Sequence, residues 1–283
     1  MNLKIIHETE YAFTSEVFLE PHYVRLKPKS TPHNRLDHFS LTILPHPTGL
    51  SNQLDEEGNL IHFCWFDGMT TTLKIRSESV VVTENYNPFN FILYPPNFFT
   101  VPFIYTELQQ TILKSDLNFV HVSDSLIEYG KQIAEKSNHD TILFVTNLTR
   151  QIHTDFLIEF REVGIPHQPN EAFDLKRGSC RDLTWMQINL LRYMGVAARF
   201  VSGYYYFARE EEDTAFELHA WLEVFLPGAG WVGFDPSHGM IAGNSHIPIV
   251  SSSHFENTMP VTGTIRGKGD STLITRVMIK SIE

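Results

Sequence analysis

The chain has 283 residues, of which 42% are hydrophobic and 19% are charged, and its formal net charge is −11. This composition is that of an ordinary folded protein with enough chain for two domains. The negative charge argues against the concentrated positive field that non-specific binding to nucleic acid or to an anionic membrane requires, so we expect neither partner.

The start of the chain carries no targeting signal that we recognise. Residues 1–10 (MNLKIIHETE) lack the apolar run and the small-residue cleavage site of a secretory signal. No stretch approaches the roughly 20 apolar residues that span a bilayer. The two cysteines, Cys64 and Cys180, fit a reducing compartment, since a disulfide between them would remove the free thiol. We therefore expect a cytoplasmic protein.

The first part of the chain consists of short β-like runs separated by proline and glycine. Such punctuation indicates a sandwich-like antiparallel domain, which we assign to residues 1–110. Cys64 lies among strand-forming aromatic residues and is expected to be buried and inert. Residues 87–99 carry too many aromatic side chains for a flexible linker and predict a packed connector. The expected strands are residues 3–11, 23–26, 39–44, 60–66, 72–82 and 91–93.

Helical periodicity begins after this region. Ser123 and Asp140 are suitable N-caps for two helices with one apolar face each. A third helix is predicted to begin at Cys180 and to end at Gly195, a residue type favoured in the left-handed conformation after a helix. The pattern becomes β from Val196 onward.

We therefore assign a core to residues 111–250 and C-terminal strands that pack on the body to residues 251–283. Within these parts, residues 247–250 and 273–282 are expected to return as strands, and residues 261–270 to form a loop or hairpin.

Cys180 stands where a nucleophile would be activated. It lies in the stretch 178–182 (GSCRD), directly before an amphipathic helical pattern. The N–H groups of a first helical turn are unpaired and favour a nearby negative charge, which lowers the pKa of a thiol. We interpret Cys180 as a nucleophile. Asp182, in the same turn, has either a stabilising role through the helix dipole or a catalytic one.

A cysteine nucleophile needs a base and a group that orients the base. Residues 216–224 alternate apolar and polar, which places His219 on the face opposite the apolar residues. Asp235 stands where a proline ends the next β-like run. If the two runs pair around the turn 227–230, His219 and Asp235 approach each other. The predicted site is a triad formed with Cys180.

These motifs resemble those of the transglutaminase-like superfamily of papain-type folds. The matching stretches are 178–182 (GSCRD), 195–204 (GVAARFVSGY), 219–221 (HAW) and 231–237 (WVGFDPS). The resemblance covers roughly residues 120–245, and the first hundred residues are similar to the bacterial transglutaminase-like N-terminal region.

This resemblance implies an α+β fold. The helix that bears the cysteine would pack on an antiparallel β-sheet, preceded by a β-sandwich-like N-terminal domain. The resemblance also implies site roles: Cys180 would be the nucleophile, His219 the general base and acid, and Asp235 the residue that orients His219.

The implied chemistry is acyl transfer through a thioester. Resolution of the thioester by water makes a cysteine protease or amidase, and resolution by an amine makes a transglutaminase. We expect hydrolysis of peptide or isopeptide bonds in a protein or peptide substrate. Protein-glutamine γ-glutamyltransferase activity, arylamine acetyl transfer and a non-catalytic interaction module are the alternatives.

The tetrahedral oxyanion of such a reaction needs hydrogen-bond donors. The backbone N–H of Cys180 is one candidate, and Gln168 is a second by analogy with papain-like sites. Trp185 and Trp221 could wall a groove, although core packing is the default expectation for both.

We expect no metal ion and no cofactor. The histidine pairs at positions 33 and 38 and at positions 238 and 246 lack the spacing of zinc ligands, and the two cysteines form no CxxC motif. The acidic run 210–213 fits a solvated hairpin tip better than a calcium site.

Overall fold

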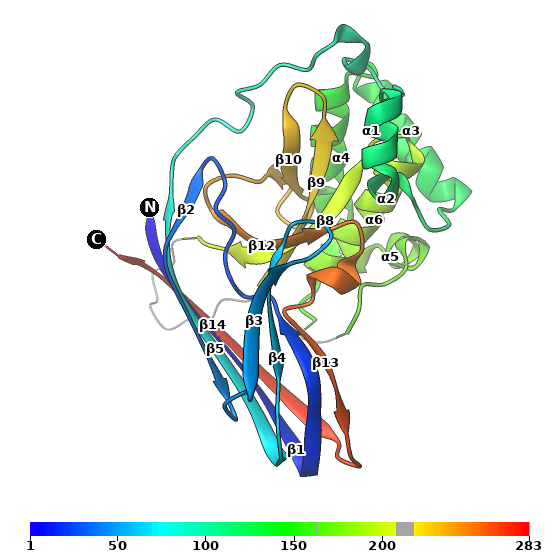
Figure 1. Ribbon diagram of the computed structural model, residues 1–283. Coiled ribbons are helices and arrows are strands. Elements are labelled where there is room, and N and C mark those ends of the chain that lie inside the picture. Colours follow the sequence, from blue (N-terminus) through cyan, green and yellow to red (C-terminus); the bar gives the residue numbers. More distant parts are fainter. Residues whose placement is uncertain (162–163, 208–217, 283) are drawn as a thin grey trace.

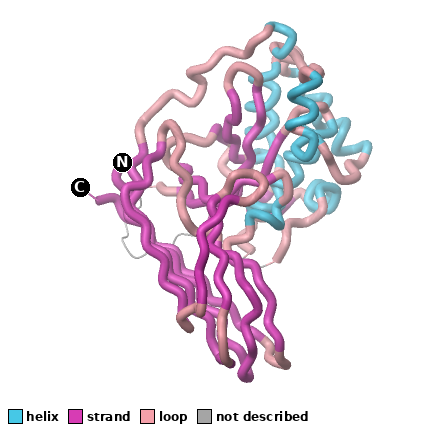
Figure 2. Tube along the Cα trace, viewed as in Figure 1, coloured by secondary structure: helices cyan, strands magenta, loops and turns pink. Residues whose placement is uncertain are grey.

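The computed structural model describes residues 1–161, 164–207 and 218–282. It contains a long antiparallel sheet and a second body in which helices cover a smaller sheet (Figures 1 and 2). The two ends of the described chain lie side by side in the long sheet, where Asn2 pairs with Ile282.

The centre of the long sheet is β1 (Asn2–Val24), along whose first half buried and partly exposed residues alternate as in a strand with one covered face. On one side it pairs with β5 (Met69–Thr83) and β4 (Leu60–Trp65). On its other side it pairs with β14 (Ser271–Ile282) and β13 (Val261–Arg266). On each side of β1, therefore, one strand pairs with its first part and the other strand pairs with its last part.

The long sheet is bent back on itself. The outer strands β2 (Asn34–Leu44) and β3 (Gly49–Leu54) pair with β5 and β4 respectively. The register of β1 against β5 shifts between Ala12 and Val17, and a bulge of this kind bends a strand. Figure 1 shows the two halves of the sheet converging at the lower end of the view.

The two halves enclose a hydrophobic core, so this region is sandwich-like although it is one hydrogen-bonded sheet. Ile43 and Ile75 come from one half, and Val24 and Cys64 from the other. Cys64 is fully buried, as predicted.

Three predictions for this region are wrong in detail. Residues 3–11 and 23–24 do not form two separate strands, because both lie within β1, which continues through a bulge from Asn2 to Val24. Residues 91–93 form no strand and lie in the connector. Residues 261–266 are not a loop or hairpin, because they pair with β1 as the strand β13.

The connector to the second body is packed, as predicted. Phe98, in the 3-10 helix η1 (Pro96–Phe98), is almost fully buried in the core of the helical body. Tyr105 donates its hydroxyl proton to the carbonyl of Phe225 at 2.7 Å. Two short helices that the sequence did not predict follow it: α1 (Glu107–Ile112) and α2 (Lys114–Leu117).

The smaller sheet is antiparallel and five-stranded. Its strands, in spatial order, are β11 (Met240–Ile241), β10 (Gly230–Asp235), β9 (Leu218–Leu226), β8 (Ala198–Tyr205) and β12 (His246–Ser252). The hairpin predicted around residues 227–230 is therefore confirmed as β9 and β10.

Helices cover one face of this sheet (Figure 2). Those before the cysteine helix are α3 (Asp124–Lys136), α4 (Thr141–Asp155) and α5 (Pro169–Leu175). The predicted caps are present, because Ser123 and Asp140 each accept a backbone N–H of the first turn that follows. The short parallel strands β6 (Leu157–Ile158) and β7 (Arg177–Gly178) bring the chain to the start of the next helix.

The helix that bears the cysteine is α6 (Cys180–Tyr193). Nearly all of its residues are buried, as expected of a helix surrounded by other elements, and it packs against β8, β9 and α5. Gly195, with φ of +82°, takes the left-handed conformation predicted for it after the helix. The fold class is confirmed: a cysteine-bearing helix packs on an antiparallel sheet, with a sandwich-like β-rich region before it.

The two bodies share a buried apolar interface. Leu3 and Ile5 of β1 contact a cluster that includes Tyr204 of β8 and Ile247 of β12. Burying each such side chain stabilises the interface by about 1.5–3 kcal/mol.

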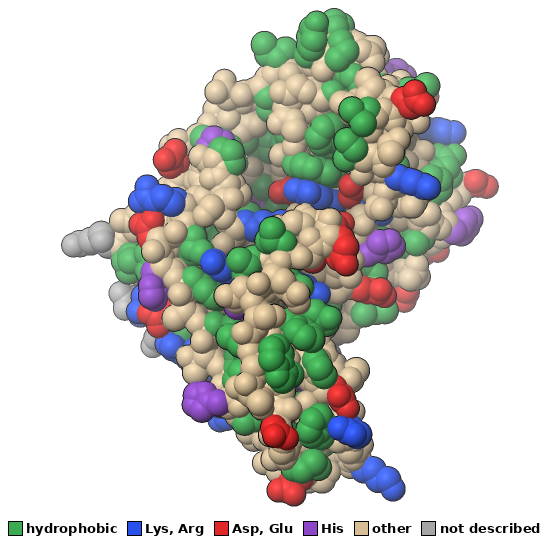
Figure 3. Space-filling view, in the orientation of Figure 1, with side chains coloured by type: hydrophobic (Ala, Val, Ile, Leu, Met, Phe, Trp, Pro, Cys, Tyr) green, Lys and Arg blue, Asp and Glu red, His purple; other side chains and the backbone are tan. Residues whose placement is uncertain are grey.

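Acidic and basic side chains are interspersed on the face shown in Figure 3. No helix of the described residues combines the length and the apolarity that crossing a membrane requires.

Candidate active site

Cys180 is the first residue of α6 because the residues around it form a capping box. Asp182 accepts hydrogen bonds from the backbone N–H and the hydroxyl of Ser179, both at 2.7 Å. This pair fixes where the helix begins. The cysteine is free, and the residue as a whole is partly exposed.

Asp182 also ties the preceding loop to the helix. Its buried carboxylate accepts the backbone N–H of His167 at 2.6 Å and a guanidinium N–H of Arg161 at 2.5 Å. Of the two roles left open by the sequence, the contacts of Asp182 are those of a residue that positions the loop and the helix start.

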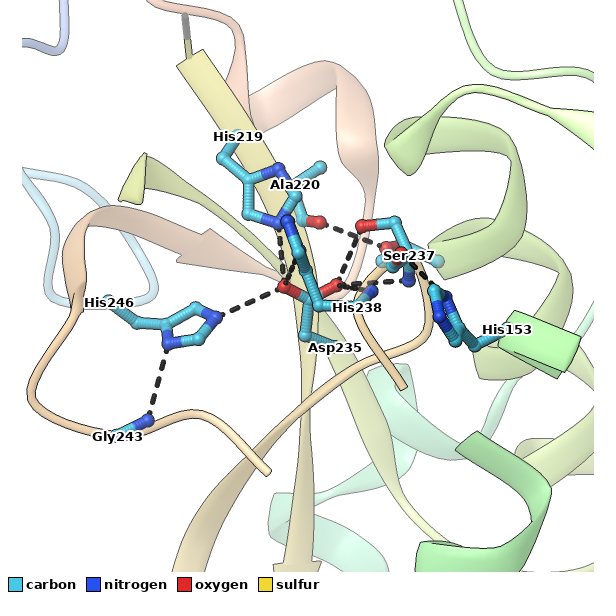
Figure 4. Close-up of polar contacts among 9 residues, drawn as sticks. His153, His219, Ala220, Asp235, Ser237, His238, Gly243 and His246 are labelled. Carbon is cyan, nitrogen blue, oxygen red and sulfur yellow. Dashed lines mark hydrogen bonds and ion pairs between the residues drawn. The ribbon is translucent and has the colours of Figure 1, made fainter. Parts of the chain in front are cut away.

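His219 and Asp235 meet through the β9–β10 hairpin. Nε2 of His219 lies 2.7 Å from Oδ2 of Asp235, which is fully buried (Figure 4). Because this contact occupies Nε2, the ring has only Nδ1 to offer to the thiol of Cys180.

The thiol, the imidazole and the carboxylate shift one another's protonation. Burial alone would raise the pKa of Cys180, but the hydrogen bond and charge of His219 and the backbone of Ala220 lower it further than burial raises it. Burial alone would lower the pKa of His219, yet the charge and hydrogen bond of Asp235, followed by Cys180, raise it to about 10. These directions favour a thiolate beside an imidazolium.

Asp235 remains ionised although it is buried. Burial would raise its pKa, but the charge and hydrogen bond of His219 and the hydrogen bonds of His238 and His246 hold it well below the ordinary value. Its second oxygen, Oδ1, accepts the backbone N–H and the hydroxyl of Ser237, at 3.0 and 2.7 Å. The carboxylate is thus held from several directions (Figure 4).

Two histidines that the sequence did not assign to the site share Oδ2 of Asp235 with His219. Nδ1 of His238 lies 2.8 Å from this oxygen and Nε2 of His246 lies 3.1 Å from it. The backbone N–H of Gly243 donates to Nδ1 of His246, so Nδ1 is an acceptor and Nε2 carries the proton that goes to Asp235.

These two histidines differ in what a sequence could reveal. His238 follows Asp235 by three residues across the Asp-Pro turn, a local signal that the predicted strand end contained. His246 belongs to β12, which reaches the site only because it pairs with β8. Spacing along the chain does not encode that pairing.

The loop after Asp235 is anchored to α4. Nδ1 of His153 lies 2.9 Å from the carbonyl oxygen of Ser237. Gly239 packs against the same ring at φ of +65°, and a Cβ at this position would lie 2.9 Å from Cβ of His153. Both the positive φ and the close approach require glycine.

A cavity of about 650 Å³ opens around the thiol and the imidazole. Its walls include Cys180, His219 and His238 from the helical body. They also include Thr9 of β1 and Thr275 of β14, which belong to the long sheet. The cavity therefore lies between the two bodies, a common location for ligand sites.

The structure does not bring Gln168 to this cavity. Gln168 is exposed, precedes α5 as its N-cap residue, and is not among the described residues that line the cavity. The backbone N–H of Cys180 lies in the first turn of α6, where N–H groups have no acceptor within the helix. Trp185 and Trp221 are buried, as expected of core residues.

Among the described residues, His219, Asp235 and His238 form a group whose ligand atoms lie within 4.8 Å of one another, a separation that could suit a metal ion. One nitrogen of the His219 ring and one nitrogen of the His238 ring already lie at hydrogen-bond distance from the same oxygen, Oδ2 of Asp235. A metal ion would have to displace these hydrogen bonds. The acidic run 210–213 lies outside the described residues.

Two family models match the chain. Residues 3–82 match the bacterial transglutaminase-like N-terminal region, and residues 128–236 match the transglutaminase-like superfamily.

Relatives of similar length occur in mycobacteria. An uncharacterized protein of Mycobacterium tuberculosis is 24% identical over 282 residues, which cover 96% of this chain and 90% of the relative. One from Mycobacterium leprae is 23% identical over 282 residues, covering 96% of this chain and 95% of the relative.

Among solved structures, a candidate cysteine protease from Cytophaga hutchinsonii has a similar fold. The TM-score is 0.74 at 18% identity, and the match covers 100% of this chain and 91% of that chain.

Proposed function

The chain belongs to the transglutaminase-like superfamily, and from this premise we propose that it is a thiol-dependent acyl-transfer enzyme that hydrolyses peptide or isopeptide bonds. The proposal assigns Cys180 as the nucleophile, His219 as the general base and acid, and Asp235 as the residue that orients His219. The description of the Cytophaga hutchinsonii fold neighbour as a candidate cysteine protease agrees with this reading.

One observation carries the proposal. Nε2 of His219 lies 2.7 Å from the buried carboxylate of Asp235, while the same ring lowers the pKa of the Cys180 thiol. A histidine held in this way by a carboxylate is the arrangement that keeps a cysteine as thiolate and returns a proton later in the reaction.

In the first half-reaction the thiolate of Cys180 attacks the amide carbonyl carbon, which forms a C–S bond and places negative charge on the carbonyl oxygen. The N–H of Cys180 at the start of α6 is the proposed donor to this oxyanion. As the intermediate collapses, Nδ1 of His219 gives its proton to the leaving nitrogen, the C–N bond breaks, and a thioester remains.

In the second half-reaction water attacks the thioester carbonyl. His219 takes a proton from the water, the C–S bond breaks, and the carboxylic acid leaves while the thiolate–imidazolium pair is restored. Turnover requires Cys180 as a free thiol, so we also propose a reducing, cytoplasmic setting.

The test has two parts. Labelling by iodoacetamide is followed at Cys180 and Cys64 from pH 5 to 10 by peptide mass spectrometry, in the native protein and in His219→Ala. Dimethylcasein is then incubated with the protein and a fluorescent amine, and both new amino termini and incorporated fluorescence are measured.

We expect iodoacetamide to label Cys180 below pH 8 in the native protein but not in His219→Ala. We also expect the native protein to produce new amino termini in dimethylcasein, and the Cys180→Ala variant to produce none. Equal labelling of the two cysteines would contradict an activated thiolate. If fluorescence were incorporated into dimethylcasein and no new amino termini appeared, the reaction would be amine transfer and not hydrolysis.

A further inference from the structure

One face of the long sheet continues from the buried interface into the cavity of the candidate active site. Odd-numbered residues of β14 and of the first half of β1, before its bulge, share this face, since side chains alternate along a strand. The cross-strand pairs on it are Ile5 with Ile279, His7 with Val277, Thr9 with Thr275, and Tyr11 with Leu273.

The chemistry of this face changes along β1. Leu3 and Ile5 are buried against the helical body. The next residue on the face is His7, the last one that is packed between the two bodies. Its Nδ1 lies 3.0 Å from the hydroxyl oxygen of Tyr204, and its Nε2 lies 3.1 Å from Oγ1 of Thr9. Beyond His7 the face lines the cavity at Thr9 and Tyr11, and Tyr11 also packs against the apolar core of the long sheet.

The part of the face beyond His7 reaches the cavity of the candidate active site. Thr9, Tyr11, Leu273 and Thr275 line the cavity that Cys180 also lines. We call these four residues the sheet wall. None of these four side chains carries a charge at neutral pH.

The wall also lacks charge at its inner end. Burial lowers the pKa of His7 to about 4, so this histidine is neutral at physiological pH. The acidic and basic side chains that line the cavity are those of Glu159, Arg161 and Arg181, which belong to the helical body and not to the sheet, and Arg161 is paired with Asp182.

We propose that the sheet wall binds the acyl donor as an extended, uncharged segment of polypeptide next to the bond that Cys180 attacks. This inference rests on the proposed function and names its substrate class. An extended peptide alternates its side chains as a strand does, which suits a wall in which Thr275 offers a hydroxyl and Tyr11 and Leu273 offer apolar surface, while the Thr9 hydroxyl is already within hydrogen-bond distance of His7. A cavity of about 650 Å³ accommodates a short segment and excludes a folded domain.

The test compares two electrophiles that alkylate Cys180. Iodoacetamide is too small to need the wall. The chloromethyl ketone of benzyloxycarbonyl-leucyl-alanyl-alanine carries a neutral peptide, and the thiolate displaces chloride to form a C–S bond. The ratio of the two second-order rate constants therefore measures peptide binding and not thiol reactivity.

Leu273→Asp places a charge on the wall, and Ile274→Asp is its matched control. Both residues are on β14 and exposed, but their side chains lie on opposite faces. We expect Leu273→Asp to slow the peptide reagent at least ~10-fold while iodoacetamide reacts as before. Ile274→Asp should alter neither rate.

A second reagent with lysine in place of leucine protects the test against a folding defect. Leu273→Asp should favour the lysyl reagent over the leucyl one, whereas a misfolded variant would react poorly with both. Thr275→Glu, with Thr272→Glu as its control on the other face, repeats the comparison at a second position.

If the ratio of the rate constants of the peptide reagent and iodoacetamide were unchanged in the variants at both wall positions, the proposed role of the sheet wall would be wrong. The proposed function would still stand if Cys180 reacted faster than Cys64. If iodoacetamide itself did not distinguish these two cysteines in the native protein, the proposed function would fail, and the inference with it.

Discussion

Nε2 of His246 lies 3.1 Å from Oδ2 of Asp235, although His246 stands on a different strand of the sheet and 11 residues further along the chain. The ring is almost fully buried, and burial lowers its pKa, so it stays neutral. Because the N–H of Gly243 occupies Nδ1, His246 acts as a fixed donor to the carboxylate. It therefore positions Asp235 without touching a substrate.

His246→Ala should lower turnover by about 10-fold, because Asp235 loses a donor on the oxygen that holds His219. Its free energy of unfolding should fall by about 2–4 kcal/mol, since a buried ring is removed. His246→Gln, whose amide retains a donor, should recover part of the turnover. The measurements are kcat and urea unfolding. If His246→Ala loses stability but keeps native kcat and KM, the ring serves packing alone.

The two cysteines should differ strongly in the pH at which they react. His219 lowers the pKa of Cys180, while burial raises the pKa of Cys64 to about 11. In His219→Ala the largest remaining effect on the Cys180 pKa is burial, which raises it, and only the backbone of Ala220 still lowers it. The labelling curve of Cys180 should therefore move to higher pH. Labelling by iodoacetamide at each pH, read by mass spectrometry, checks this. If the labelling curve of Cys180 had the same midpoint pH in His219→Ala as in the native protein, a contact between the thiol and the imidazole would be contradicted.

Asp235→Asn should lower turnover by at least ~10²-fold, because the neutral amide no longer fixes the tautomer and charge of His219. The thiol of Cys180 should remain present and should need a higher pH to react. A matched Asp174→Asn, at an exposed position on α5, should behave as the native protein. Steady-state rates and labelling curves of the two variants decide whether the buried carboxylate is required.

The same pair makes stability depend on pH in a defined window. His219 has a folded pKa of about 10, above its ordinary value of 6.5, so its contribution to stability is complete below pH 6.5 and is lost as pH rises toward 10. The pKa of Asp235 is depressed, so its contribution is present above its ordinary value of 3.8 and is lost as pH falls through the folded pKa.

The stability advantage of the native protein over Asp235→Asn should therefore be greatest between about pH 4 and 6.5 and should shrink toward pH 10. Urea midpoints of both proteins at pH 5, 7, 9 and 10 test this. An advantage that stays constant over that range would show that His219 is not charged in the folded state.

The elements that carry the proposed triad were predictable because their signals are local. Capping residues and a helical pattern locate the start of α6, and alternation with a tight turn locates the β9–β10 hairpin. The hairpin then determines which residues face each other. His219 and Asp235 could therefore be paired from the sequence alone.

The remaining features depend on contacts between distant parts of the chain. His246 reaches Asp235 through the pairing of β12 with β8, and Thr275 reaches the cavity because β14 pairs with β1, more than 250 residues earlier. Gln168 is suggested by analogy and not by a local pattern; it is exposed and is not among the described residues that line the cavity, so its role as an oxyanion donor stays a prediction.

Asp182→Ala should destabilise the protein without removing any group from the proposed triad. The buried carboxylate holds Ser179, His167 and Arg161, and its loss leaves several donors without their acceptor. The expected loss in the free energy of unfolding is about 3 kcal/mol, the lower end of the range for one partner removed from a buried ion pair, because Arg161 is partly exposed. Asp182→Asn keeps the shape and should lose less.

Labelling separates this structural role of Asp182 from a direct one. Since the start of α6 would be less well fixed, Cys180 in Asp182→Ala should react more slowly with iodoacetamide, and the midpoint pH of its labelling should stay near the native value because His219 and Asp235 are intact. A midpoint displaced as far as that of His219→Ala would instead place Asp182 among the groups that set the protonation of the thiol.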